Sequence, residues 1–108
     1  MATDLVSTEP ATGKEIWRGT SGNVDDTIER ARKAMRQWAR EPLGRRIEFM
    51  RRFANEVRKH GETFAELIAR ETGKPLWEAR TEVEAVIGKV EISITAYMER
   101  TGQKKLDS

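Results

Sequence analysis

A Gly-Lys-Pro turn at residues 73–75 most constrains the fold of this chain, because it separates two stretches with helical patterns. Gly73 can adopt the left-handed backbone conformation that ends many helices, and Pro75 is tolerated only at the start of a new one. Apolar residues recur at helical spacing on both sides of the turn. The sequence therefore predicts a short helix over residues 62–71 and a long one over residues 76–100.

The long segment carries apolar residues at intervals of seven, at Leu76, Val83, Val90 and Tyr97. Residues 90–94 also alternate between apolar and other side chains as a strand would. The sevenfold repeat persists over the whole segment, and we therefore favour a helix.

Gly88 lies in the middle of that predicted helix. A glycine there costs roughly 1 kcal/mol relative to alanine. We expect a neighbouring backbone to approach closely at this position, in preference to a functional kink.

The region before the turn predicts two more helices and a hairpin. One helix runs from Val24 to Arg40 with Asn23 as its N-cap, and the next runs from about Leu43 to His60. Residues 5–21 hold apolar pairs on either side of turn-forming residues, which predicts a β-hairpin arm anchored by Trp17. The predicted fold class is mainly α: an N-terminal β-hairpin arm followed by about four amphipathic helices.

Composition limits what the chain can do. At 108 residues it forms at most one small domain, and its 20 basic and 18 acidic residues give a net charge of +2 with both signs mixed along the chain. We therefore expect no nucleic acid and no membrane as partners. Without cysteine there is no thiolate nucleophile or metal ligand. The start carries no pattern of a signal peptide, so a cytoplasmic location is expected.

Several charged groups invite functional interpretations that their surroundings do not support. The basic residues of 45–59 alternate with glutamates, and the spacing predicts pairs of Arg52 with Glu48 and Glu56 on a solvated helix face. Arg80 precedes Glu84 by four residues, which predicts another such pair. The lone His60 has no nucleophile in a recognisable arrangement and is expected to serve at a helix end. The Gly-Lys pair does not belong to a phosphate loop, because proline follows the lysine.

Three stretches together resemble the aldehyde dehydrogenase family. They are EPATGKEI at residues 9–16, ARETGKPLWEA at residues 69–79 and ITAYMERTG at residues 94–102, in that order. Within the family, residues 71–102 are most similar to the succinylglutamate semialdehyde dehydrogenases of arginine breakdown. The resemblance covers residues 5–102, and its strongest single motif spans residues 71–79.

The resemblance implies a longer parent enzyme. Such an enzyme is NAD(P)-dependent, oligomeric and cytoplasmic, and it oxidises an aldehyde to a carboxylate through a cysteine thiohemiacetal. The family's catalytic and dinucleotide-binding residues map to no position here, so we expect no catalytic and no cofactor-binding residue in this segment. The segment is then a peripheral part of the α/β coenzyme-binding domain. It divides into a hairpin arm (residues 5–21), a helical region (residues 22–102) and a polar tail (residues 103–108).

The resemblance also implies a monovalent-cation site. Relatives bind such an ion with backbone oxygens near the opening hairpin and a carboxylate before the Gly-Lys-Pro turn. The matching positions are Ser7, Thr8 and Glu71, with glutamate where many relatives have aspartate. The alternative is that Glu71 is an ordinary surface carboxylate at a helix end.

Two functions from different classes follow. The first is a scaffold segment whose partner is the remainder of the parent enzyme, or a second copy bound through the apolar helix faces once the segment is separated from it. The second is a free-standing helical module that binds another protein through the same faces.

Overall fold

The computed structural model describes residues 3–102 and residue 106. Two strands, β1 (Asp4–Thr8) and β2 (Glu15–Thr20), are followed by α1 (Val24–Arg40), α2 (Leu43–Lys59), α3 (Gly61–Thr72) and α4 (Leu76–Arg100). The mainly α prediction with a leading hairpin is confirmed. The predicted polar tail falls almost wholly on residues 103–105 and 107–108, which lie outside the described residues.

Local chemistry sets the helix boundaries that the sequence predicts. The Asn23 side chain accepts a hydrogen bond from the backbone N–H of Asp26 at 3.0 Å, which satisfies a free donor in the first turn of α1. Gly73 ends α3 with φ +78°, and its N–H donates to the carbonyl oxygen of Ala69. Pro75 then precedes α4, which runs unbroken through the stretch with the strand-like alternation.

The core is a small cluster where α4 packs against α2 and α3. Its buried members are Ala54, Ala65, Ala79, Val83, Ile87 and Val90. The two fully buried members, Ala65 on α3 and Ala79 on α4, are small side chains, and small side chains let two helices approach closely. No large side chain among the described residues is fully buried.

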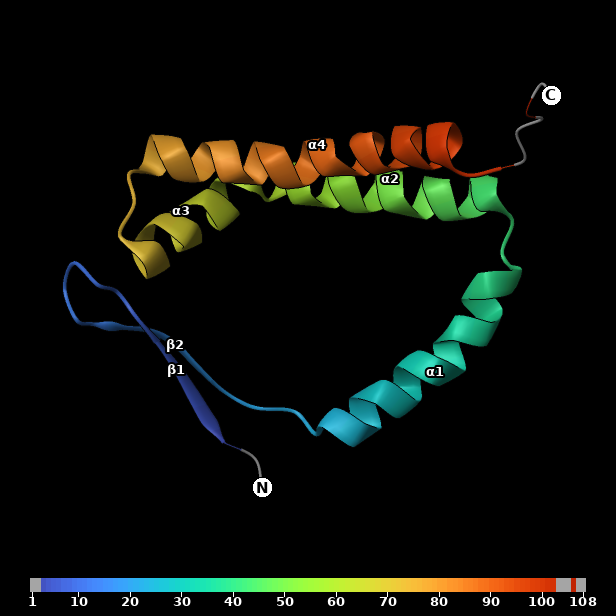
Figure 1. The fold of residues 1–108 in the computed structure, drawn as a ribbon. Coiled ribbons are helices and arrows are strands. Elements are labelled where there is room, and N and C mark those ends of the chain that lie inside the picture. The colour runs from blue at the N-terminus through green and yellow to red at the C-terminus, as the bar shows by residue number, and fades with distance from the viewer. Residues whose placement is uncertain (1–2, 103–105, 107–108) are drawn as a thin grey trace.

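Helix α1 stands apart from that core, as Figure 1 shows. None of its residues is buried, and the predicted apolar stripe is open to solvent, with Val24 73% and Met35 61% exposed. Near its end, Trp38 packs against Phe49 of α2 with 5.8 Å between ring centroids. The helix is thus attached to the rest of the chain mainly at its two ends.

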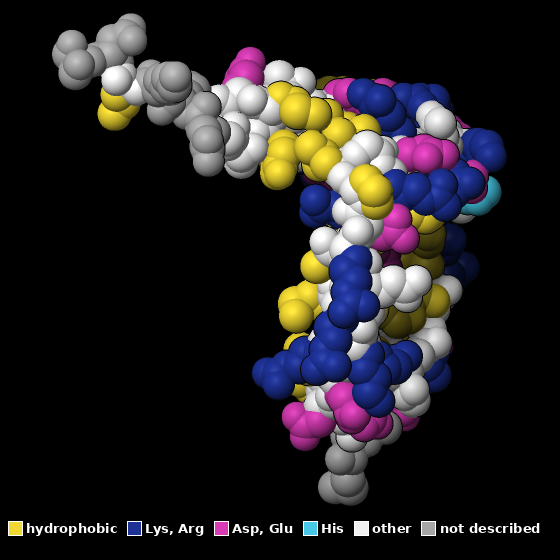
Figure 2. Space-filling view, turned by 90° about the vertical axis from the view of Figure 1, so that its right-hand side faces the viewer, with side chains coloured by type: hydrophobic (Ala, Val, Ile, Leu, Met, Phe, Trp, Pro, Cys, Tyr) yellow, Lys and Arg dark blue, Asp and Glu magenta, His cyan; other side chains and the backbone are white. Residues whose placement is uncertain are grey.

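The overall dimensions reflect this open arrangement. The radius of gyration is 19.1 Å, whereas a compact domain of this length has about 13 Å. The space-filling view in Figure 2 shows hydrophobic side chains lying at the surface beside lysines and arginines. The apolar faces predicted from the sequence exist, but the chain covers only part of them.

Three details differ from the sequence predictions. A Cβ added at Gly88 would meet nothing within 4 Å, so no other backbone segment among the described residues approaches it closely. Arg80 binds Glu62 of α3 at 2.6 Å in place of Glu84. Glu48 and Glu56 bind Arg45 and Lys59, not Arg52, whose guanidinium lies over the Phe49 ring. Tertiary packing supplies the partner of Arg80, whereas Glu48 and Glu56 pair with basic residues three positions away on their own helix instead of four.

Candidate functional site

The carboxylate of Glu71 joins the hairpin to the helices. Its Oε1 atom accepts a hydrogen bond from the Ser7 hydroxyl at 2.7 Å and another from the Trp17 indole N–H. Ser7 and Trp17 are direct cross-strand partners in the antiparallel pair. Side chains of such partners project from the same face of a hairpin, which is why both reach one carboxylate.

Further contacts surround this junction. Arg70 Nε donates to Glu9 Oε1 at 3.1 Å, and the Thr12 hydroxyl donates to the other oxygen of Glu9 at 2.7 Å. Pro10, in the hairpin loop, lies against Gly73, where an added Cβ would be 3.8 Å from the proline Cβ. The loop of the hairpin and the end of α3 therefore fit together over the first part of the Gly-Lys-Pro turn.

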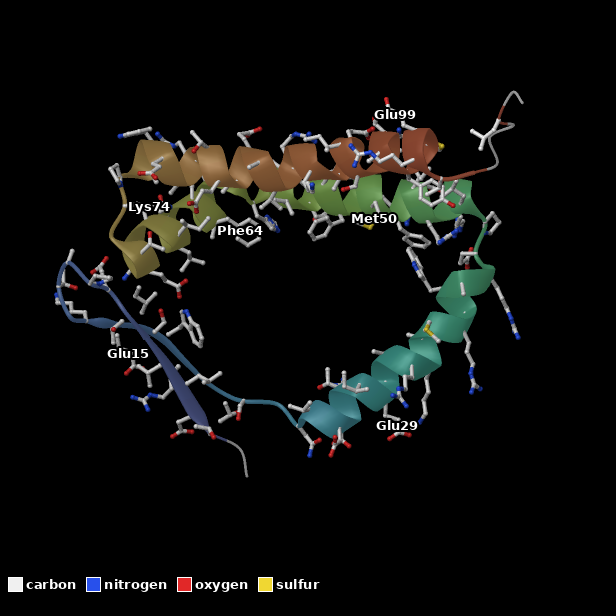
Figure 3. The ribbon with its side chains drawn as sticks, in the orientation of Figure 1. Glu15, Glu29, Met50, Phe64, Lys74 and Glu99 are labelled. Atoms are coloured by element: carbon white, nitrogen blue, oxygen red, sulfur yellow. The ribbon has the colours of Figure 1, made fainter. Side chains whose placement is uncertain are left out.

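Lys74, labelled in Figure 3, occupies the same turn and points along α4. Its ammonium group binds Glu82 and lies 3.8 Å from Glu78. The hydrogen bond to Glu82 raises the pKa of Lys74 above its ordinary value. The lysine of the motif thus ties the turn to the first turns of α4 and does not face the hairpin.

The hydrogen bonds at the junction favour the charged form of the carboxylate. Donation from Ser7, and next from Trp17, lowers the pKa of Glu71 below its ordinary value of 4.5. The same holds for Glu9, whose pKa is lowered by hydrogen bonds from Thr12 and Arg70. Both acids of the junction are therefore ionised at neutral pH.

The structure brings together two of the three residues predicted for a cation site. Ser7 and Glu71 are in direct contact, and Thr8 follows Ser7 at an irregularity in the strand register. No group of three or more His, Cys, Asp or Glu side chains among the described residues is arranged to hold a metal ion. The cation site stays a prediction. Trp17, predicted from the sequence to anchor the hairpin, does so through a hydrogen bond from its indole N–H to Glu71, while the residue remains 45% exposed. The sequence analysis did not identify Glu71 as its partner.

A second candidate is an apolar groove of about 520 Å³ between α2 and α4. Its wall on α2 and the end of α1 includes Trp38, Ile47, Met50 and Phe53, and its wall on α4 includes Val86 and Tyr97. Met50 is labelled in Figure 3. Five of these side chains are exposed despite being apolar, which leaves the groove without a cover in this chain.

Arg46 is a functional candidate that sequence reasoning did not single out. It lines the groove, and its Nε atom is buried with no hydrogen-bond partner among the described residues. In the sequence, Arg46 is one of several arginines in a basic stretch. Only the structure separates it from its neighbours, whose charged groups reach solvent or a glutamate.

A membrane-crossing role finds no support in the helices that the structure describes, since none combines the length and apolar character that a span needs.

Comparison with known sequences gives a consistent result. Residues 2–108 match the sequence model of the aldehyde dehydrogenase family. A protein from Novosphingobium aromaticivorans is 62% identical over 105 residues, which cover 97% of this chain and 22% of the relative. A protein from Sphingopyxis alaskensis is 54% identical over 107 residues, which cover 99% of this chain and 22% of the relative. A protein from Paraburkholderia xenovorans is 48% identical over 104 residues, which cover 94% of this chain and 21% of the relative.

All three relatives carry the name N-succinylglutamate 5-semialdehyde dehydrogenase. The chain spans about a fifth of the length of each. The similarity therefore covers nearly all of this chain and a minor part of each relative.

Proposed function

This chain belongs to the aldehyde dehydrogenase family, and from that premise we propose that it is a scaffold segment of an NAD(P)-dependent enzyme. In this role its helices and hairpin support the catalytic body of the longer polypeptide. The segment has no cysteine and so cannot supply the nucleophile that the family uses, and we expect the catalytic residues to come from the rest of the enzyme.

The observation that carries this proposal is the excess of exposed surface. The chain exposes 9189 Å², whereas a folded monomer of 12.4 kDa exposes about 6,100 Å². The difference is of the order of 3,000 Å² on this chain alone, whereas permanent protein interfaces bury about 2,000–5,000 Å² counted over both partners. Much of the exposed apolar surface is contributed by α1 and the groove between α2 and α4. Such surface is expected of a segment that another part of the enzyme covers.

The names of the relatives suggest the substrate of the parent enzyme. We propose N-succinylglutamate 5-semialdehyde, oxidised to the carboxylate in the breakdown of arginine, because the relatives so named are up to 62% identical. The family implies NAD or NADP as the oxidant. The segment does not fit a dinucleotide, since it lacks a Gly-x-Gly-x-x-Gly sequence and its groove is lined by bulky apolar side chains. We assign the cofactor to the rest of the enzyme, and the cytoplasm as its place of action.

The alternative function that the sequence allows is a free-standing module that binds another protein. The comparisons do not favour it, because the similar proteins are named as dehydrogenases and match over nearly all of this chain. Self-association of the separated segment through its open faces stays a prediction.

A chimera tests the proposal. This chain replaces the matching segment of the Novosphingobium relative, and formation of NADH or NADPH from N-succinylglutamate 5-semialdehyde is compared with that of the unaltered relative. We expect activity within about an order of magnitude, and no activity when the segment is deleted. A chimera that is inactive or insoluble, or a separated 108-residue chain that oxidises the aldehyde or binds NAD in calorimetry, would contradict the scaffold role.

A cation site at the hairpin junction is a second proposal, supported by the contact of Ser7 with Glu71. Oxygen donors from a carboxylate and from strand residues suit a hard cation, and a single carboxylate suits a monovalent one. Because Glu71 Oε1 already accepts two hydrogen bonds, an ion would use its other oxygen or replace the Ser7 hydroxyl. In this role the ion would strengthen the attachment of the hairpin to α3.

A further inference from the structure

We propose that the groove between α2 and α4 seats an apolar segment from the rest of the dehydrogenase, and that this segment places an Asp or Glu carboxylate against Arg46. The inference rests on the scaffold function proposed above. It adds to that function a defined docking site and the chemistry of the group that fills it.

The first support is the unsatisfied Nε atom of Arg46. Nearly all buried polar groups in native proteins have a hydrogen-bond partner, because an unpaired one loses its hydration without compensation. Arg46 Nε is buried and has no partner among the residues that the structure describes. If nothing else packs into the groove, the lost hydration of Arg46 Nε stays uncompensated. An acceptor oxygen brought into the groove would compensate for it by forming a hydrogen bond.

The second support is the sign of the charges. Arg46 and Lys89 are the charged residues that line the groove, and the lining contains no acid. Met50, Phe53 and Tyr97 supply an apolar surface around them. An apolar segment with one carboxylate complements both features, and a carboxylate can accept two hydrogen bonds from a guanidinium.

The same charges argue against a second copy of the chain as the occupant. In a symmetric dimer closed through this groove, the same patch meets itself, so the two Arg46 and the two Lys89 side chains would gather at one interface. Like charges placed together disfavour such pairing. The relatives, by contrast, have almost four fifths of their length outside the matched region, which can supply the acid.

The experiment uses the full-length chimera with the Novosphingobium relative. Arg46→Met removes the guanidinium but preserves an unbranched side chain that resembles the apolar stem of arginine. Arg58→Met is the matched control, because Arg58 is exposed on α2 and contacts Asn55 of its own helix. We expect Arg46→Met to shorten the half-life of the enzyme at elevated temperature by about tenfold or more, because a buried carboxylate is left unpaired. Arg58→Met should change it less than twofold.

Crosslinking identifies the occupant without relying on a variant that folds poorly. A zero-length carbodiimide reagent joins an amine to a carboxylate in contact with it, and Lys89 lies in the same groove. We expect peptide mapping of the chimera to find Lys89 joined to an Asp or Glu from the body of the enzyme. Lys33, which binds Glu29 on α1, is the internal control and should join Glu29.

The outcomes are distinguishable. An inactive chimera overturns the scaffold function itself. An active chimera in which Arg46→Met and Arg58→Met behave alike, and in which Lys89 forms no link to the body, overturns only the docking site. A link from Lys89 to an acid of another copy of this segment shows a second copy as the occupant and overturns the proposal as well.

Discussion

Gly73 and Gly88 should respond to alanine with opposite signs, because the structure gives them different backbone conformations. Gly73 has φ +78°, and a new Cβ there would lie at an ordinary contact distance of 3.8 Å from Pro10. The cost of Gly73→Ala therefore comes from the left-handed backbone and not from a clash, and it amounts to about 1–2 kcal/mol. Gly88 is inside α4 with open space around it, so Gly88→Ala should stabilise by about 0.8–1 kcal/mol.

Urea unfolding of the 108-residue chain, followed by far-ultraviolet circular dichroism, measures the difference. The two variants should differ by about 2–3 kcal/mol, which separates their midpoints by roughly 1–2 M urea at the slopes usual for small proteins. Gly73→Asn should fall between Gly73→Ala and the unaltered chain, because asparagine tolerates the left-handed conformation better than alanine. Repeating the experiment at several protein concentrations separates folding from self-association.

Two results would refute this reasoning. If Gly73→Ala unfolds at the same urea concentration as the unaltered chain, α3 does not end in a left-handed cap. If Gly88→Ala is destabilising in the separated chain, another part of that chain lies against α4 at this position. In the full-length chimera, by contrast, a loss of stability from Gly88→Ala would mean that the body of the enzyme supplies the close neighbour expected from the sequence.

The remaining predictions concern the hairpin junction. Because hydrogen bonds lower the pKa of Glu71 in the folded chain, its contribution to docking is present above its ordinary pKa of 4.5 and is lost as the pH falls through the lower folded value. The indole N–H signal of Trp17 in nuclear magnetic resonance should report this loss, Glu71→Gln should abolish the pH dependence, and Glu84→Gln on the surface of α4 should preserve it. If the cation proposal holds, K⁺ or Na⁺ should shift the same signal at constant ionic strength, whereas tetramethylammonium should not; equal shifts from all three would count against a site at Ser7, Thr8 and Glu71.

The sequence predicts the elements well because their signals are local. The N-cap at Asn23, the glycine cap at Gly73 and the helical repeat of α4 each involve residues within a few positions of one another. The predicted bounds of α1 and α4 agree with the structure, and those of α3 differ by one residue at each end. Helix caps and periodic apolar faces are therefore sufficient to locate these elements along the chain.

Contacts between residues far apart in the sequence could not be predicted from local spacing. Arg80 has Glu84 one turn away, yet it binds Glu62 because α3 packs beside α4. The family resemblance points to Glu71, but the contact of Glu71 with Trp17 joins residues 54 positions apart and depends on how the hairpin folds back onto α3. Arg46 resembles its neighbours in the sequence, and only the structure shows that its Nε atom is buried without a hydrogen-bond partner among the described residues.

The way α1 is attached has a mechanical consequence. Its N-terminal end follows the hairpin, which Glu71 fixes to α3, and its C-terminal end is held where Trp38 meets Phe49. Two fixed ends restrict the orientation of a rigid rod even when nothing packs along its middle. A protein surface that meets α1 therefore finds its stripe of valine, isoleucine and methionine already aligned, and association loses less conformational entropy than it would with a freely swinging helix.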